Sequence, residues 1–168
     1  SVSSSSGRCL ETMVTKEDLG LFHPDLVFCD IDAADTDELF ELLGQRLSPK
    51  GYIKENWLSA IKERERDYAT GLQTQTIGVA IPHADNCVNK AYIAIVKPVH
   101  PVVFQPMGGI GDPVSAELII NLGILREGGE VDLLQGLMRI FLDDDATNNV
   151  MQQETPEGIV NAITSRSM

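Results

Sequence analysis

The sequence predicts an α/β fold, a single domain whose mixed parallel and antiparallel central sheet is flanked by helices on both faces. Three observations lead to this prediction. Short β-branched runs form a central block over residues 77–122, helical patterns precede and follow it, and some connections within it are too short for a helical crossover. Neighbouring strands joined by such short connections should run antiparallel, whereas helical connections allow parallel neighbours.

One strand and two helices are expected ahead of the central block. Residues 26–29 form a short apolar run, which we expect to be an edge strand. Thr36, followed by two acidic residues, is expected to be the N-cap of a helix that continues to Leu47 with leucines at helical spacing. A second helical pattern covers residues 55–68, and residues 72–76 are expected to form a polar loop.

The central block and the last third of the chain contain the remaining elements. The apolar runs predict strands over residues 77–81, 92–96, 102–104 and 117–122. The glycine-rich stretch before the last of these strands lacks the Gly-Lys-Ser/Thr of a P-loop and predicts a turn. Beyond the last strand, apolar residues at i, i+3 and i+4 spacing predict helices, and Pro156 fits the first turn of the final one.

The composition is that of an ordinary globular protein with a marked excess of acidic residues. The 168 residues are enough for one domain, and 43% of them are hydrophobic. The 25 acidic residues outnumber the 13 lysines and arginines, which gives a net charge of −12. This charge argues against a nucleic acid or an anionic membrane surface as the partner, and it is compatible with a small basic protein.

The cysteines and the N-terminal segment bear on compartment and domain limits. The three cysteines are odd in number and form no CxxC pair, which favours reduced thiols in a cytoplasmic protein. No apolar run approaches the roughly 18–20 residues that span a bilayer, so we expect no membrane insertion. Residues 1–20 are expected to be disordered or poorly ordered, and residues 21–168 to form the domain.

The stretch over residues 77–83 ends in a Pro-His pair and is the most informative motif of the chain. Proline cannot donate a backbone hydrogen bond, so strand pairing should stop at Pro82. His83 then lies where the sheet opens to solvent, on a backbone that the proline restrains. Imidazole titrates near neutral pH and can act as a base, a metal ligand or a nucleophile. The simplest alternative is a polar residue that leaves the core at a strand end.

Three kinds of chemistry are compatible with His83. A metal site would use the H-x-D-x-C run of His83, Asp85 and Cys87, but no second cluster supplies the remaining ligands of a closed zinc site. A hydrolytic role needs a presented nucleophile, and the sequence contains no G-x-S-x-G elbow. A phosphoryl-carrying role needs a cation, which Arg64 or Arg66 supplies if the following turn folds the helix end towards the strand end.

Two features accompany the phosphoryl-carrying interpretation. The hydroxyls of Thr70 and Thr76 could donate further hydrogen bonds to a phosphate. The charged run over residues 62–66, which contains both arginines, also has a simpler interpretation as a solvated helix face. The residue pattern by itself therefore leaves the chemistry of His83 open.

Three motifs follow one another along the chain: Arg64-Glu65, Thr70-Gly71, and the Val-Ala-Ile-Pro-His sequence that ends at His83. This ordered set resembles the EIIA domains of the mannitol–fructose type (EIIA type 2) of the bacterial phosphoenolpyruvate-dependent sugar phosphotransferase system. The resemblance covers nearly the whole chain after residue 20, and it implies a mannitol/fructose EIIA-like fold and a cytoplasmic phosphocarrier without metal or organic cofactor. In that role His83 would accept a phosphoryl group from phospho-HPr and pass it to a cysteine of a cognate EIIB, which serves the membrane component EIIC.

The resemblance also implies roles for individual residues. Arg64 matches the family's phosphate-side arginine. Mannitol- and fructose-type members carry a second active-site histidine at the start of the penultimate helix, whereas residues 128–132 contain none. Glu130 is the candidate to replace it, with a surface carboxylate at a helix start as the simpler interpretation. The missing histidine and a longer loop before the Pro-His strand resemble the galactitol-type branch, which implies uptake of a galactitol-like polyol or sugar.

Two other functions remain open from the sequence. EIIA-like domains also act as regulatory modules of transcription regulators, in which the phosphorylated histidine reports sugar supply. The sequence shows no helix-turn-helix segment or basic patch that would favour this alternative. The second alternative is a binding module without phosphotransfer, in which His83 merely lines a pocket.

Overall fold

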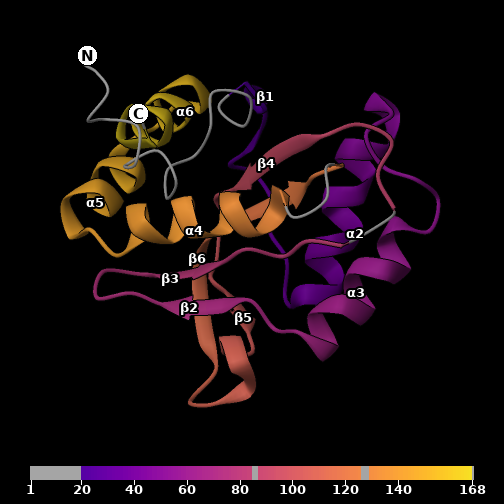
Figure 1. Ribbon diagram of the computed structural model, residues 1–168, viewed down its shortest axis with the longest axis horizontal. Coiled ribbons are helices and arrows are strands. Elements are labelled where there is room, and N and C mark those ends of the chain that lie inside the picture. The colour runs from indigo at the N-terminus through magenta and orange to yellow at the C-terminus, as the bar shows by residue number, and fades with distance from the viewer. Residues whose placement is uncertain (1–19, 85–86, 126–128, 168) are drawn as a thin grey trace.

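The computed structural model describes residues 20–84, 87–125 and 129–167 (Figure 1). The strands are β1 (Phe22–Phe28), β2 (Gly71–Gln73), β3 (Gly78–Ala80), β4 (Tyr92–Val96), β5 (Val102–Phe104) and β6 (Val114–Gly123). The helices are α2 (Thr36–Leu47), α3 (Trp57–Asp67), α4 (Gly129–Phe141), α5 (Asp144–Gln152) and α6 (Pro156–Ser167), with short 3-10 turns at Ser48–Lys50 and Met107–Gly109. Residues 1–19 lie outside this description, so the expected disorder of the N-terminal segment stays a prediction.

The six strands form one mixed sheet, which confirms the predicted fold class. The strand order is β1-β4-β6-β3-β2, with β5 paired to β6 beside this path. The pairs β4–β6, β5–β6 and β2–β3 are antiparallel, whereas β1–β4 and β3–β6 are parallel. Because β3 and β6 are parallel neighbours, their carboxyl ends lie side by side at one edge of the sheet.

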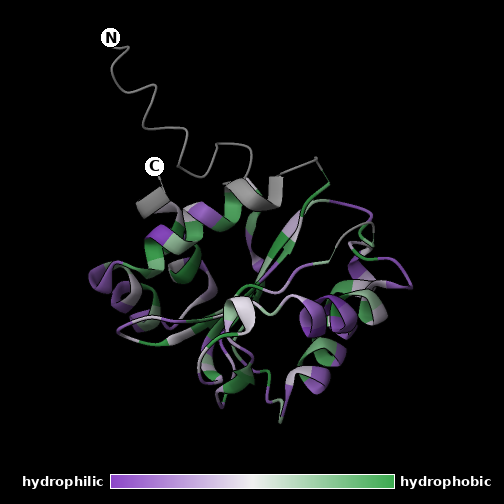
Figure 2. Cartoon of the chain, turned by 60° about the horizontal axis from the view of Figure 1, so that its bottom comes forward, coloured by the Kyte–Doolittle hydropathy of each residue, from purple (hydrophilic) through white to green (hydrophobic). Residues whose placement is uncertain are grey.

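Helices cover both faces of this sheet, α2 and α3 on one and α4, α5 and α6 on the other (Figure 1). Successive residues of β4 join opposite clusters, since Ile93 packs with the second group of helices and Ala94 with the first. Figure 2 shows that hydrophobic residues run along the strands. The helices, in contrast, carry both hydrophobic and hydrophilic residues. None of the helices in the described part of the chain has the length and apolar character that a membrane span requires.

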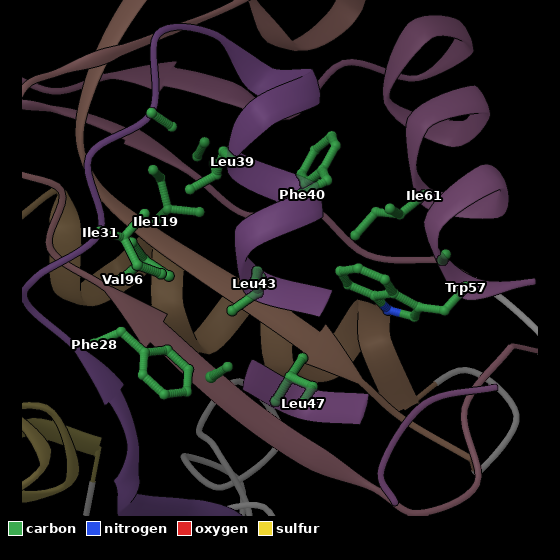
Figure 3. Close-up of a cluster of buried hydrophobic side chains, with 14 of the residues drawn as sticks. Phe28, Ile31, Leu39, Phe40, Leu43, Leu47, Trp57, Ile61, Val96 and Ile119 are labelled. Atoms are coloured by element: carbon green, nitrogen blue, oxygen red, sulfur yellow. The ribbon is translucent and has the colours of Figure 1, made fainter. Parts of the chain in front are cut away.

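The face covered by α2 and α3 shows how helical periodicity builds the core. Leu39, Leu43 and Leu47 follow one another at i, i+4 and i+8 on α2, and all three are fully buried. From α3, the side chains of Trp57 and Ile61 reach into the same cluster (Figure 3). The two helices thereby fix the position of the α3 end, which continues into the strand beside β3.

The N-cap of α2 is Asp35 and not the predicted Thr36. The Asp35 backbone is extended, and its carboxylate accepts a hydrogen bond of 2.9 Å from the backbone N–H of Glu38. The Glu38 carboxylate in turn accepts a bond of 2.7 Å from the N–H of Ala34. This exchange resembles a capping box, and it requires the helix to begin one residue after Asp35.

The predicted polar loop over residues 72–76 is also partly wrong. Residues 71–73 form the edge strand β2, and the loop is only the tight connection from β2 to β3. The Thr74 hydroxyl organises that connection: it accepts from the N–H of Ile77 at 2.9 Å and donates to the Ile77 carbonyl at 2.6 Å. A three-residue strand stabilised by backbone pairing has too few side chains to show a period of two.

Candidate functional site

His83 lies at the edge of the sheet where β3 and β6 end. Regular pairing of β3 stops at Ala80, as expected ahead of a proline, and an isolated parallel bridge then joins His83 to Leu122 of β6. Gly123, the last residue of β6, pairs with Tyr92 at the start of the antiparallel strand β4. The ends of β3 and β6 and the beginning of β4 therefore meet at this edge.

The His83 ring is partly buried, and one of its nitrogens has a defined partner. Nδ1 lies 3.1 Å from the carbonyl oxygen of Ile81. A carbonyl oxygen only accepts hydrogen bonds, so Nδ1 carries the proton in this contact. In the neutral imidazole the lone pair then resides on Nε2. The arrangement makes Nε2 the nucleophilic or metal-binding atom of this ring.

A buried polar network holds the peptide that precedes His83. The Pro82 carbonyl accepts from the backbone N–H of Leu122 at 3.2 Å and from Nδ2 of Asn121 at 3.0 Å. The Tyr92 hydroxyl donates a short hydrogen bond to Oδ1 of Asn121, and both of these side chains are fully buried. Burial raises the pKa of the Tyr92 hydroxyl, which keeps it protonated as a donor.

Sequence reasoning missed this network, although one signal for it was present. Asn121 is the single polar residue within the apolar run of β6 that ends at Leu122. A buried amide requires hydrogen-bond partners, so it marks a place where polar groups meet inside the fold. Its partner Tyr92 is identified only by the register of β4 against β6.

Arg64 lies near the end of α3, and its guanidinium stacks on the ring of Tyr68. The Cζ atom is 4.8 Å from the ring centroid, a favourable cation–π distance. Beyond α3 the chain enters β2, where Gly71 pairs with Ala80 of β3. The turn after α3 thus leads from the helix end to the carboxyl end of β3, as the phosphoryl-carrying interpretation of His83 requires. A contact between Arg64 and a phosphate on His83 stays a prediction.

Arg66, the other candidate cation, belongs to a different surface. It is exposed and lines a cavity of about 250 Å³ together with Lys62, Val103 and Gln105. This cavity is bordered by α2, α3 and the strand β5, and β5 pairs with the first half of β6. The placement favours Arg64 over Arg66 as the cation for His83.

The structure contradicts the suggested role of Thr70 and Thr76 as phosphate donors. The Thr70 hydroxyl and backbone N–H both donate to the carboxylate of the buried Glu65, each at 2.8 Å. Burial raises the pKa of Glu65 to about 7. The Thr76 hydroxyl donates to the Asp144 carboxylate at 3.2 Å. Thr76 lies in the connection that leads into the amino end of β3, and His83 follows the opposite end of this strand.

Some predicted site residues fall outside what the structure describes. Glu130 is in the first turn of α4, but its side chain lies outside the described residues, so its role stays a prediction. Asp85, the middle residue of the H-x-D-x-C run, also lies outside them, whereas Cys87 is fully buried. Among the residues that are described, no group of three or more histidine, cysteine or acidic side chains could hold a metal ion.

Comparison with protein families gives a match over almost the whole fold. The family model described as "Phosphoenolpyruvate-dependent sugar phosphotransferase system, EIIA 2" matches residues 20–166. The matched range contains every described strand and helix except the last residue of α6, Ser167.

Individual relatives agree with the family match. The galactitol-specific EIIA component of Escherichia coli K12 is 28% identical over 108 residues, which are 64% of this chain and 71% of that protein. The mannitol-specific phosphotransferase enzyme IIA component of Staphylococcus aureus Mu50 is 22% identical over 139 residues, 83% of this chain and 92% of that protein.

A solved structure shows the same fold at low identity. It is the complex of the mannitol enzyme IIA of Escherichia coli with phosphorylated mannitol enzyme IIB, and the match has a TM-score of 0.68 with 19% identity. The match covers 84% of this chain and 95% of that one. The likeness confirms the predicted mannitol/fructose EIIA-like fold.

Proposed function

The chain belongs to the EIIA type-2 family of the phosphoenolpyruvate-dependent sugar phosphotransferase system, and we propose that His83 is the residue on which it carries the phosphoryl group. EIIA components are phosphotransferases that transfer phosphoryl groups through a histidine, so the chain is a phosphotransferase component of this system. In the proposed cycle, phospho-HPr is the donor and the cysteine of a cognate EIIB is the acceptor. Both reactions take place in the cytoplasm.

The observation that carries the proposal is the Nδ1 contact of His83 with the Ile81 carbonyl. It fixes the tautomer that leaves the Nε2 lone pair available, at the point where the strand leaves the sheet. The two other histidines, His23 and His100, are exposed. Neither of them directly follows a proline. We therefore assign the phosphoryl acceptor to Nε2 of His83.

The transfer step needs little covalent chemistry from the protein. The Nε2 lone pair of His83 forms a bond to phosphorus while the phosphorus–nitrogen bond of phospho-HPr breaks and its electrons return to the donor imidazole. The cysteine thiolate of EIIB then attacks phosphorus, and Nε2 is the leaving atom. Throughout, Nδ1 keeps its proton and donates it in the hydrogen bond to the Ile81 carbonyl. Catalysis consists of positioning and of stabilising charge on the phosphoryl oxygens.

Arg64 is the cation proposed to offset the charge of the bound phosphoryl group. By analogy with other phosphorylated residues, the group brings about −1.5 to −2 charges. Stacking on Tyr68 restrains the guanidinium of Arg64, so less side-chain entropy is lost when it binds the phosphoryl oxygens. We propose that Glu130, in the first turn of α4, orients the phosphoryl group. It would replace the second active-site histidine of the mannitol- and fructose-type members.

The surface next to His83 suits brief contacts with two protein partners. Tyr68 after α3 is 65% exposed, and Leu125 after β6 is 59% exposed. Both are large apolar side chains on segments that adjoin the sheet edge of His83, and apolar side chains of this kind contribute the centre of protein interfaces. The net charge of −12 favours a basic partner. The galactitol-specific relatives support a galactitol-like polyol or sugar as the transported substrate.

Incubation with phosphoenolpyruvate, enzyme I and HPr, followed by intact mass spectrometry, tests the proposal. We expect the wild-type chain to gain one phosphoryl group and the His83→Ala variant to gain none. The His23→Ala and His100→Ala variants are the matched controls and should be phosphorylated like the wild type. Addition of a galactitol-type EIIB should then remove the group from the wild type. A phosphorylated His83→Ala variant would refute the assignment, and a stable phosphoprotein that no EIIB discharges would favour the regulatory alternative.

A further inference from the structure

We infer that Asn121 and Tyr92 are positioning residues for phosphoryl transfer, because their buried hydrogen-bonded pair orients the peptide on which the His83 ring is mounted. The inference rests on the proposed function of His83 and adds two residues to it. Both would act through the Pro82 carbonyl, to which the Asn121 amide donates.

The backbone alone holds the Pro82–His83 peptide weakly. Regular β3 pairing ends at Ala80, and Pro82 has no N–H with which to continue it. The backbone hydrogen bond that reaches this peptide comes from Leu122 and is 3.2 Å long. The Asn121 amide adds a second donor at 3.0 Å, from a side chain that is completely shielded from water.

The two hydrogen bonds of the Asn121 amide are compatible with one orientation of its side chain. The Pro82 carbonyl can only accept, so Nδ2 of Asn121 faces it, and Oδ1 is left to accept from the Tyr92 hydroxyl. An amide turned by half a rotation would set Oδ1 against the Pro82 carbonyl oxygen and lose that hydrogen bond. A buried polar group left without a partner is costly, so one orientation dominates.

The Tyr92 ring is in turn held in place by its neighbours. A Cβ atom added at Gly123, opposite Tyr92 in the β4–β6 ladder, would overlap the ring, so glycine is needed at this position for the ring to lie there. Tyr52 also packs against the Tyr92 ring, with a centroid distance of 5.4 Å. The direction of the hydroxyl is thus determined by packing.

Packing alone does not require an asparagine at residue 121. Its neighbours along β6, Ile120 and Leu122, are apolar, and the adjoining Tyr92 and Ile119 belong to the α2–α3 core cluster. An apolar side chain would fill this position without the desolvation of an amide. The specific effect of Asn121 is the second bond to the Pro82 carbonyl, next to the Ile81 carbonyl that binds Nδ1 of His83.

Three variants separate positioning from general stability. Asn121→Leu removes both hydrogen bonds at similar volume, and Tyr92→Phe removes only the hydroxyl that donates to the amide oxygen. Thr147→Val is the matched control, because Thr147 is also fully buried and its hydroxyl donates to carbonyls at the α4–α5 junction, including that of Phe141 at 3.2 Å. All are compared as full chains, well below their unfolding temperatures.

Two measurements are made on each variant. The first is the rate of phosphoryl transfer from phospho-HPr as a function of its concentration. Misplacement of reacting atoms by about 1 Å can slow a reaction by roughly 100-fold, so we expect Asn121→Leu to lower the maximal rate by about 10- to 100-fold. Half-saturation should not change, because no docking residue is altered. The second is ¹⁵N NMR of the His83 ring, in which we expect the Nδ1–H tautomer of the wild type to become a mixture in Asn121→Leu.

The outcomes distinguish this inference from the proposed function. The inference is overturned if Asn121→Leu retains the wild-type tautomer and maximal rate, or if Thr147→Val shows the same losses. If Asn121→Leu does not fold, Tyr92→Phe, which keeps the ring, decides with the same two measurements. If the wild-type chain accepts no phosphoryl group, the proposed function fails, while the tautomer of His83 in the variants still shows whether Asn121 orients the ring.

Discussion

Glu65 provides a quantitative test of how the end of α3 is built. Its carboxylate is buried beneath the turn that leads to β2 and accepts two hydrogen bonds from Thr70. Burial disfavours the ionised form more than these bonds favour it, so the pKa rises from its ordinary value of 4.5 to about 7. The change we propose is Glu65→Gln, which retains the shape and one acceptor but cannot ionise. Its amide can donate to the Thr70 hydroxyl, which accepts as readily as it donates.

The size and the pH range of the effect follow from linkage between protonation and folding. The folded state holds the Glu65 proton more tightly than the unfolded state does. The stability gained from this proton is fully present below about pH 4.5 and is lost as the pH rises through about 7. A shift from 4.5 to about 7 corresponds to about 3 kcal/mol in the free energy of unfolding. Above about pH 7, a neutral amide at this position avoids the loss, so the Glu65→Gln variant should be more stable than the wild type by up to that amount.

Urea unfolding of both proteins across this pH range measures the difference. We expect nearly equal stability at about pH 4.5 and a growing advantage of Glu65→Gln up to about pH 8. Glu63→Gln, at an exposed neighbouring position on α3, is the matched control and should leave the pH dependence unchanged. A difference between wild type and Glu65→Gln that does not vary with pH, or a wild type that is the more stable protein in alkaline solution, would show that the burial argument is wrong.

Two further substitutions test helix ends by the same unfolding measurement. Asp35→Ala should lower the free energy of unfolding by about 1 kcal/mol, because the first turn of α2 loses its side-chain acceptor, whereas Asp37→Ala at an exposed position should cost less. Lys97→Met should lower it by about 1–2 kcal/mol, since the ammonium donates to the Met151 and Gln153 carbonyls at the end of α5. Wild-type stability in either Asp35→Ala or Lys97→Met would contradict the role given to that side chain.

The parts of the fold that depend on local periodicity could be predicted from the sequence. The leucines of α2 recur at helical spacing, and β4 is a continuous apolar run rich in β-branched residues. The α2 N-cap was misplaced by one residue because Asp35 and Thr36 are both good capping residues, and only the extended backbone of Asp35 decides between them. The strand β2 was missed because its stability comes from backbone pairing with β3.

The position of His83 at the end of a strand was predictable from the sequence, and the groups that support it were not. The Pro-His pair after a buried run predicts that His83 lies at a strand end, since proline ends the pairing of the strand. The network of Asn121 and Tyr92 depends on long-range strand register, which no local pattern contains. Glu65 is intermediate: the charged run around it suggests a solvated face, yet it continues the i, i+4 stripe of Trp57 and Ile61 and is buried like them.

The central claim is that His83 carries the phosphoryl group on Nε2, and NMR of the ¹⁵N-labelled, phosphorylated chain tests it most directly. Coupling between phosphorus and a ring nitrogen identifies the atom that is modified. The structure predicts coupling to Nε2 of His83, with Nδ1 still protonated against the Ile81 carbonyl. Phosphorus on Nδ1, or on any residue other than His83, would contradict the account.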